Sequence, residues 1–309
     1  MHIAQVRDWS EGPRYVTVDD APAPSETQIQ LRVLAAGLHQ VVRSRASGQH
    51  YSARGLPHNV GIDCVGRDVA TGKLYYCLNM TRGFGSFAEL VTVDRGVLHP
   101  LPDSVDPVSF AASVNPAMSS WLALTQRTVN LPKDFTVLVV GATSASGRLA
   151  ALVAKALGAG KVVGVGRNEA TLAKVKGLDA HVVQKEVVTD TDFSQVDCDV
   201  VLDYVYGDLT VHLLSTLNIK RPLQYVMIGG LSRKEIAIPP AILRSRDITI
   251  RGSGPGAIGL DVIQKEVKKL VPAMTGWDLL DAHSVPMKDI EAAWRDESLK
   301  SQGRLVFIP

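Results

Sequence analysis

Cysteine is rare in this sequence, which holds only Cys64, Cys77 and Cys198 among its 309 residues. The three are widely separated and no CxxC pair occurs. This spacing excludes a disulfide framework and a zinc knuckle built from cysteines. We therefore expect free thiols in a reducing compartment and place the protein in the cytoplasm.

An excess of one charge and a long apolar run are also missing. The 33 Lys and Arg residues nearly balance 31 Asp and Glu residues, so neither nucleic acid nor an anionic membrane is expected as a partner. No stretch approaches the roughly 18 apolar residues that cross a bilayer, and the first residues show no secretion signal. Hydrophobic residues still make up 46% of the chain, enough to bury a core, and the length suggests about two domains.

Hydrophobic patterning differs between the first third of the chain and the part that follows. Short alternating apolar runs with Gly and Pro predict a mainly β region over residues 1–112. A continuous apolar strand at 137–140 then opens a series in which strands alternate with helices, typical of βαβ units and a parallel sheet. Later strands are predicted at 161–165, 181–183, 199–203, 223–229 and 248–252, and helices at 169–176 and 209–217. The pattern leaves open whether the last strands and helix complete the first domain or extend the sheet.

A turn of small residues joins the strand at 137–140 to an amphipathic helix, in the segment VLVVGATSASGRLAALVAKALG. Gly141 permits a tight turn and Gly147 allows the helix to pack closely on the strand. Backbone N–H groups at the helix start can then receive a pyrophosphate. Ser144 takes the middle position, where glycine allows the closest approach, and Ser144 and Ser146 offer hydroxyls to phosphate. The alternative is an ordinary turn between a strand and a helix.

The end of the next strand indicates which dinucleotide is bound. An NAD site would place Asp or Glu near Gly166 to accept hydrogen bonds from the ribose hydroxyls. The sequence has Arg167 and Asn168 there instead, and a guanidinium without a carboxylate suits the 2′-phosphate of NADPH. The alternative is that Arg167 is solvated and Asn168 only caps the following helix.

Further motifs occur in a characteristic order: VLAAGLHQVVRSRASGQHY, GIDCVGR, GSFAEL, the glycine turn, DVVLDYVYG, YVMIGG, ITIRGSGPG and GRLVF. Together they resemble the medium-chain dehydrogenase/reductase superfamily, in its zinc-free quinone oxidoreductase branch. The resemblance implies an α/β fold in which a Rossmann doubly wound parallel sheet, residues 113–268, binds NADP. This domain would be inserted into a GroES-like mainly-β substrate domain formed by residues 1–112 and 269–309. It also implies a homodimer through the strand near 248–251.

The resemblance further implies which residues contact the cofactor. These contacts are expected at Ala145, Ser146, Arg167, Val205, Tyr206, Ile228, Gly229, Gly230, Ser253 and Gly254. Zinc-dependent members carry Cys and His ligands, but this chain has GLHQVV and GIDC at those places, so we expect no catalytic metal. Typical quinone reductases have an Asn–x–x–Asp pair where this chain has His39 and Val42.

We therefore predict an NADPH-dependent, zinc-independent reductase that transfers a hydride to a quinone or an α,β-unsaturated carbonyl compound, including an enoyl substrate. His39 and Tyr51 are the candidate proton donors, because reduction at carbon leaves an oxygen or α-carbon to be protonated. Water is the alternative donor. Two other functions stay open, because a fold does not determine a function: a nucleotide-binding sensor without turnover, and a non-redox step on a biosynthetic intermediate.

Overall fold

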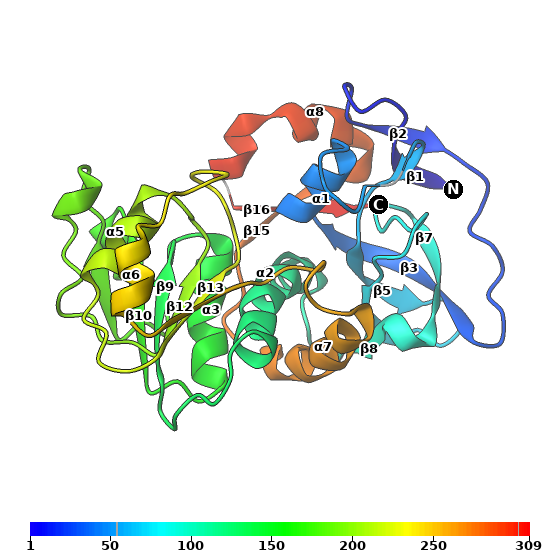
Figure 1. Cartoon of the computed structure of the whole chain (residues 1–309). Coiled ribbons are helices and arrows are strands. Elements are labelled where there is room, and N and C mark those ends of the chain that lie inside the picture. The colour runs from blue at the N-terminus through cyan, green and yellow to red at the C-terminus, as the bar shows by residue number, and fades with distance from the viewer. Residues whose placement is uncertain (54, 302) are drawn as a thin grey trace. The chain divides into compact units, whose positions relative to one another are not determined.

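The computed structural model describes residues 1–53, 55–301 and 303–309, which form two compact units (Figure 1). One unit consists of Met1–Asn115 together with Val267–Pro309, and the other of Pro116–Glu266. The first is built mainly from antiparallel strands and the second around a parallel sheet. This architecture confirms the predicted fold class. No helix among the described residues is long and apolar enough to span a bilayer.

The larger sheet of the first unit joins strands from both ends of the chain. Its order is β15 (Ala282–Pro286), β16 (Arg304–Ile308), β3 (Gln28–Gly37), β5 (Asp63–Asp68), β6 (Leu74–Leu78) and β8 (Leu98–Pro100), with β7 (Leu90–Asp94) paired to β3. The C-terminal strand β16 runs antiparallel to β3, with Val306 opposite Gly37. The last strands therefore complete the sheet that the first third of the chain begins.

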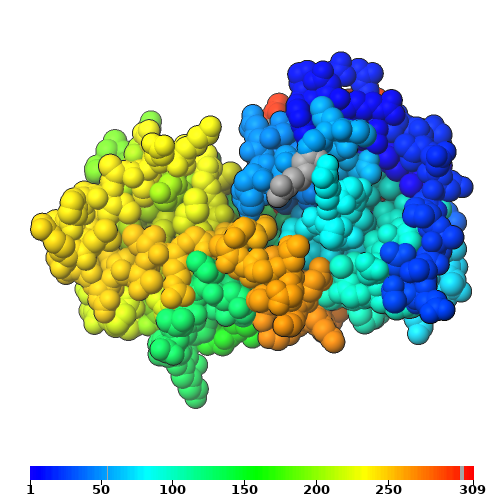
Figure 2. Space-filling model, turned by 45° about the vertical axis from the view of Figure 1, so that its right-hand side comes forward, coloured from blue at the N-terminus to red at the C-terminus, as the bar shows by residue number. Residues whose placement is uncertain are grey.

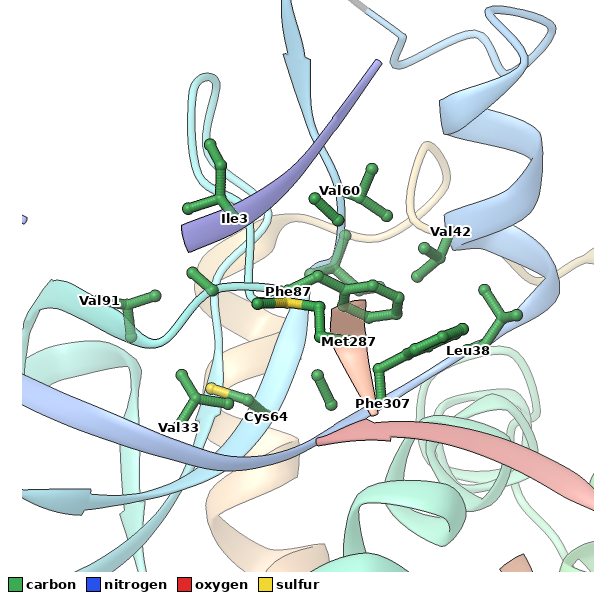
Figure 3. Close-up of a cluster of buried hydrophobic side chains, with 14 of the residues drawn as sticks. Ile3, Val33, Leu38, Val42, Val60, Cys64, Phe87, Val91, Met287 and Phe307 are labelled. Carbon is green, nitrogen blue, oxygen red and sulfur yellow. The ribbon is translucent and has the colours of Figure 1, made fainter. Parts of the chain in front are cut away.

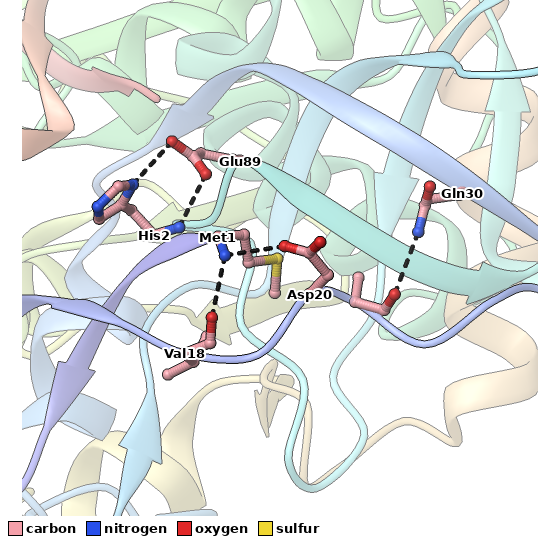
Figure 4. Close-up of polar contacts among 7 residues, drawn as sticks. Met1, His2, Val18, Asp20, Gln30 and Glu89 are labelled. Carbon is pink, nitrogen blue, oxygen red and sulfur yellow. Dashed lines mark hydrogen bonds and ion pairs between the residues drawn. The ribbon is translucent and has the colours of Figure 1, made fainter.

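A smaller sheet in the same unit has the order β2 (Pro13–Thr17), β1 (His2–Val6) and β4 (His58–Asn59). The amino group of Met1 donates to the Val18 carbonyl at 2.9 Å and to Asp20 at 2.9 Å, while His2 contacts Glu89 (Figure 4). The segment after β2, blue in Figure 2, lies on the surface. Gln30 also donates to a carbonyl of this segment, so polar contacts hold it against the sheets.

The core of the first unit follows the alternation seen in the sequence. Ile29, Leu31 and Val33 of β3 point inward and are at most 4% exposed, as a strand with one buried face requires. Side chains from distant segments meet them, including Val42 and Phe307 (Figure 3). Val42 belongs to α1 (Gln40–Ala46), so this core holds one face of that helix. The unit also contains α8 (Ile290–Arg295).

The second unit contains six parallel strands in the order β11 (Ala180–Val183), β10 (Lys161–Gly166), β9 (Thr136–Val140), β12 (Val200–Asp203), β13 (Leu223–Met227) and β14 (Ile248–Gly252). The chain starts in the middle of the sheet, builds outward to one edge and then returns to build toward the other. This is the doubly wound order of dinucleotide-binding folds. The four residues from Val137 to Val140 are at most 1% exposed, as expected of a central strand covered on both faces.

The remaining helices are α2 (Pro107–Gln126), α3 (Ala145–Ala156), α4 (Glu169–Leu172), α5 (Asp208–Thr216), α6 (Pro240–Ser245) and α7 (Leu260–Met274). Short 3-10 turns occur at Arg95–Val97, Val188–Asp190, Met287–Asp289 and Glu297–Ser301. The helix predicted at 169–176 is wrong in length, because α4 ends at Leu172. Beyond it Lys174 and Val175 bond to carbonyls three residues back, and Gly177 has φ +84°, so the chain tightens into turns.

Candidate functional site

The predicted cofactor residues of the second unit all lie at, or shortly after, the carboxyl ends of its parallel strands. In a parallel sheet these ends lie along one edge, and ligands bind where neighbouring connections diverge. Strand β9 has β10 on one side and β12 on the other, so the turn after β9 lies at that point of divergence. The structure thus brings the segments after β9, β10, β12, β13 and β14 to one edge of a single sheet.

The turn after β9 has the geometry of a phosphate cradle. Gly141 has φ +86°, a conformation that favours glycine. A Cβ at Gly147 would lie 2.2 Å from the Gly141 carbonyl oxygen, so only glycine lets α3 approach the turn this closely. The N–H groups of Ala145 and Ser146 open the helix and have no intrahelical acceptor. These donors and the positive end of the helix dipole fit a pyrophosphate.

Ser144 has a structural task that the sequence did not reveal. Its hydroxyl oxygen accepts a hydrogen bond from the Gly147 N–H at 3.0 Å and caps α3. The side chain therefore satisfies one of the unpaired donors at the helix start. Contact between Ser144 and a phosphate stays a prediction. In such a contact the Ser144 hydroxyl would bind the phosphate while it still accepts the hydrogen bond from the Gly147 N–H.

The end of β10 lies directly beside this turn. Gly141 and Ala142 donate their N–H groups to the Val165 carbonyl at 3.0 and 2.9 Å. A Cβ at Gly166 would meet the Thr143 side chain at 3.2 Å. Arg167, the next residue, is exposed and forms no ion pair with any described residue. Its guanidinium is thus available to a ligand at the turn.

Asn168 supports the helix-cap interpretation for its own side chain. Its amide oxygen accepts from the Thr171 N–H at 2.9 Å, which caps α4. This cap accounts for Asn168 without a ligand, whereas Arg167 is left without a structural partner among the described residues. A contact of Asn168 with a cofactor stays a prediction.

Asp203 is a site residue that our sequence reasoning missed. The carboxylate is fully buried at the end of β12. One oxygen accepts from the N–H groups of Val205 at 2.7 Å and Tyr206 at 3.1 Å, and the other from Thr210 at 2.6 Å and Tyr225 at 2.7 Å. Burial, followed by the charge of Asp203, raises the pKa of Tyr225. The available signal was an acidic residue that directly follows a buried apolar run.

The clamp on the Val205–Tyr206 turn compensates for an unfavourable backbone. Tyr206 has φ +50°, the left-handed region that side chains other than glycine rarely adopt. Two hydrogen bonds to one carboxylate oxygen hold this conformation. The turn predicted to contact the cofactor is therefore shaped by Asp203 from inside the unit.

The segments after β13 and β14 come close to this clamp. Ile228 and Gly229 donate to the Asp203 carbonyl at 2.8 and 3.1 Å, and a Cβ at Gly229 would lie 2.7 Å from the Tyr204 carbonyl. Ser253 donates to the Met227 carbonyl at 2.8 Å. Gly230 follows in the first segment and Gly254 in the second, where a Cβ at Gly254 would meet nothing within 4 Å. The backbone at Gly254 is thus open to a ligand.

His39 of the first unit lies inside a buried polar network. The ring is 1% exposed. Its Nε2 is 3.1 Å from Asp63, whose carboxylate also accepts from Tyr76 at 2.9 Å, and Arg304 donates to Nδ1 at 3.1 Å. Because a guanidinium only donates, Nδ1 must accept and Nε2 must carry the proton. Burial lowers the pKa of His39, and Arg304 lowers it further against the opposing effect of Asp63.

This environment does not favour the proton transfer that we hypothesised for His39. Both ring nitrogens are engaged and almost none of the ring is accessible. Tyr51 differs, because its side chain is 66% exposed and its ring lies 4.1 Å from that of His50. The structure therefore separates the two candidate donors into a buried residue and an exposed one. Tyr51 as a donor stays a prediction.

The described residues contain no group of three or more His, Cys, Asp or Glu side chains placed to hold a metal ion. Ile62, at the position of a zinc ligand in zinc-dependent relatives of the resembled family, is a core residue 2% exposed. Cys64 and Cys77 face each other across β5 and β6 and are also buried. The hydrogen bond with Cys77, followed by burial, raises the pKa of the Cys64 thiol.

Comparisons with known proteins point to one group. No family model matches the chain. It is 36% identical to a probable NADPH-dependent quinone reductase of Emericella nidulans, over the whole of both chains. It is 26% identical to a quinone oxidoreductase of Sus scrofa, covering 83% of this chain and 80% of the relative. The crystal structure of a quinone oxidoreductase from Thermus thermophilus, also solved with NADPH, superposes over both whole chains with a TM-score of 0.81 and 25% identity.

Proposed function

The chain belongs to the medium-chain dehydrogenase/reductase superfamily, in its zinc-free quinone oxidoreductase-like branch, and we propose that it uses NADPH to reduce a quinone. An α,β-unsaturated carbonyl compound is an acceptor of the same chemical type, because a hydride can add to its electrophilic carbon. The full-length similarity to a probable NADPH-dependent quinone reductase supports this proposal.

Arg167 is the observation that carries the cofactor assignment. It follows β10 beside the glycine turn, is exposed, and has no ion pair within the described residues. Neither Gly166 nor Asn168 supplies the carboxylate that would accept from the ribose hydroxyls of NADH. A guanidinium forms paired hydrogen bonds with phosphate oxygens. The 2′-phosphate of NADPH is the group that would use it.

The proposed reaction adds a hydride and one proton to the quinone and yields a hydroquinone. When bound, NADPH supplies the hydride. The N–H groups of Ala145 and Ser146 would hold the pyrophosphate, and Asp203 shapes the Val205–Tyr206 turn next to it. Tyr51 or water would provide the proton, since both ring nitrogens of His39 are already engaged.

Two measurements on the full chain test the proposal. NADPH should raise the thermal unfolding midpoint more than NADH does, because a ligand that binds only the folded state stabilises it. Addition of a quinone should then consume NADPH absorbance at a rate that saturates with quinone concentration. Binding without consumption across quinones and enones would support the nucleotide-sensor alternative. An absence of binding by both nucleotides would contradict reductase and sensor alike.

From the scarcity of cysteine we also propose a cytoplasmic location. We further propose a homodimer in which the β14 strands of two copies pair with each other. Strand β14 is the last strand of its sheet, and Ile250 on it is 41% exposed. An apolar edge strand favours pairing with another strand. Light scattering should give twice the mass of the chain, and Ile250→Lys should give the single mass. A wild-type mass of one chain would contradict this assembly.

A further inference from the structure

Arg45, in the last turn of α1, is a buried cation that has no counter-ion among the described residues. The residue is only 7% exposed, and its Nε has no hydrogen-bond partner in the part of the chain that the structure describes. No carboxylate in the described part of the chain forms an ion pair with it. The two residues outside that part, Arg54 and Gln302, carry no carboxylate in their sequence identity. Burial lowers the pKa of Arg45, and no acidic neighbour acts in the opposite direction.

Two other arginines of the same unit show what compensation looks like. Arg304 is half-buried, and the charge of Asp63 supports its protonated form. Arg43 donates to the Trp294 carbonyl at 2.9 Å, and the charge of Glu297 supports it. Burying a charge is costly unless it is paired. Of these three arginines, Arg45 is the one without an acidic partner among the described residues.

The helix dipole compensates for only part of this charge. Arg45 lies near the carboxyl end of α1, where the dipole places partial negative charge. That end carries about half an elementary charge, and α1 has only seven residues. The dipole therefore explains why a cation is tolerated here and leaves room for an anion.

The chain after α1 folds back onto the end of that helix, and the positive charge of Arg45 acts on two imidazoles. His50 donates its backbone N–H to the Ser44 carbonyl at 3.1 Å, and Gly48 donates to the Arg45 carbonyl at 3.1 Å. Burial and the positive charge of Arg45 lower the pKa of His50, and the same causes lower that of His58 to about 4. Both rings are therefore neutral near pH 7 and can donate an N–H without adding charge.

The His50 ring has one defined hydrogen-bond donor, its Nε2–H group. Its Nδ1 accepts from the Ser52 N–H at 3.1 Å, so the ring proton belongs on Nε2. The ring of Tyr51 lies 4.1 Å from the His50 ring and is tilted by 32° to it. Tyr51 is 66% exposed, so it presents an aromatic surface to solvent next to the His50 ring.

We propose that Arg45, together with His50 and His58, binds an anionic oxygen group of an aromatic ligand. The guanidinium would supply the charge, the imidazoles neutral N–H donors, and the Tyr51 side chain an aromatic surface for the ligand ring. Given the proposed function, on which this step rests, the ligand is a quinone that bears a carboxylate or an ionised ring hydroxyl. The charge of Arg45 would then select anionic over neutral quinones.

Calorimetric titration with 2-naphthoate and its neutral amide, 2-naphthamide, tests the site without any turnover. Neither ligand can be reduced and no NADPH is added, so failure of the proposed reductase activity leaves this test intact. Wild-type protein should bind 2-naphthoate at least about tenfold more tightly than the amide, as expected for a charge-assisted hydrogen bond. Arg45→Met should remove the preference, and Arg45→Lys should retain part of it.

Arg32→Met is the matched control, because Arg32 is an exposed residue of the same unit and its loss changes the net charge equally. This variant should keep the preference for 2-naphthoate. Equal affinity of wild type for both ligands, or no binding of either, would overturn the proposal. So would a preference that survives in Arg45→Met or disappears in Arg32→Met. Folding of each variant is checked by its thermal unfolding midpoint.

Discussion

Arg304 directs a guanidinium N–H at Nδ1 of His39 across 3.1 Å, so the imidazole nitrogen that would take up a second proton already faces a cation. The opposite nitrogen, Nε2, lies 3.1 Å from the Asp63 carboxylate. A neutral histidine thus bridges two charged residues from β16 and β5. The bridge makes His39 part of the framework that holds the start of α1.

Truncating this bridge should destabilise the fold. Arg304→Met leaves Nδ1 of His39 without a donor and Asp63 without the nearby positive charge. We expect a loss of about 2–4 kcal/mol in the free energy of unfolding, as for other buried groups deprived of partners. Urea titration measures it, and Arg304→Lys, which keeps the charge, should lose less. A loss below about 0.5 kcal/mol for Arg304→Met would show that the network carries no stability.

Acidification should destabilise the protein through its buried histidines. The folded-state pKa values of His39 and His58 lie below 6.5, that of His58 at about 4. At a pH between a histidine's folded-state pKa and its unfolded value of about 6.5, the unfolded chain binds more protons than the folded one. The free energy of unfolding therefore decreases as the pH falls below about 6.5. His58→Gln should reduce that loss by about 1–2 kcal/mol, since solvent screens the half-buried ring. Urea midpoints of wild type and His58→Gln, measured between about pH 4.5 and pH 7.5, check this prediction. The same change of midpoint with pH in both proteins would refute it.

Arg167→Ala should discriminate between the two nicotinamide cofactors. Losing a charge-assisted contact to the 2′-phosphate should raise the Kd for NADPH about 10- to 100-fold, with less than about twofold change for NADH. Titration calorimetry measures both values. Lys174→Ala removes another exposed positive charge, on the segment that follows α4, and should change neither Kd. Equal weakening of both cofactors by Arg167→Ala would show that the guanidinium does not recognise the phosphate.

Asp203→Ala should affect stability and cofactor affinity together. The side chain accepts four hydrogen bonds, two of which hold the left-handed Tyr206. We expect a loss of about 3 kcal/mol or more in the free energy of unfolding and weaker NADPH binding. Tyr225→Phe removes one bond on the far oxygen and should cost about 1 kcal/mol without changing the Kd. If both variants weakened NADPH equally, the turn-shaping role of Asp203 would be wrong.

Arg45→Met should alter turnover only for acidic quinones. With 2-hydroxy-1,4-naphthoquinone, whose ring hydroxyl ionises, we expect KM to rise about tenfold, the value of one charge-assisted contact. The kcat should change little. With neutral 1,4-naphthoquinone both parameters should stay near wild type. The thermal midpoint without ligand should not fall, because an unpaired buried charge is removed. A matching rise in KM for both quinones would point to a general packing defect instead.

Patterns within short stretches of sequence predicted strands and turns whose formation depends on neighbouring residues. The alternation of Ile29, Leu31 and Val33 identified β3, and the apolar run at 137–140 identified β9. Gly141 and Gly147 indicated the turn because their backbone demands are local. The helix predicted at 169–176 was too long, because Ala173 and Lys174 have good helix propensity although α4 already ends at Leu172.

The sequence by itself determined the alternation of strands and helices in a nucleotide-binding unit and the absence of an acid beside Arg167, because both follow from neighbouring residues. Tertiary structure decided the state of His39, whose partners Asp63 and Arg304 come from distant positions in the chain. It likewise revealed that Arg45 is buried without a counter-ion among the described residues. Burial and charge pairing depend on which distant segments meet, and a one-dimensional pattern of residues does not contain that information.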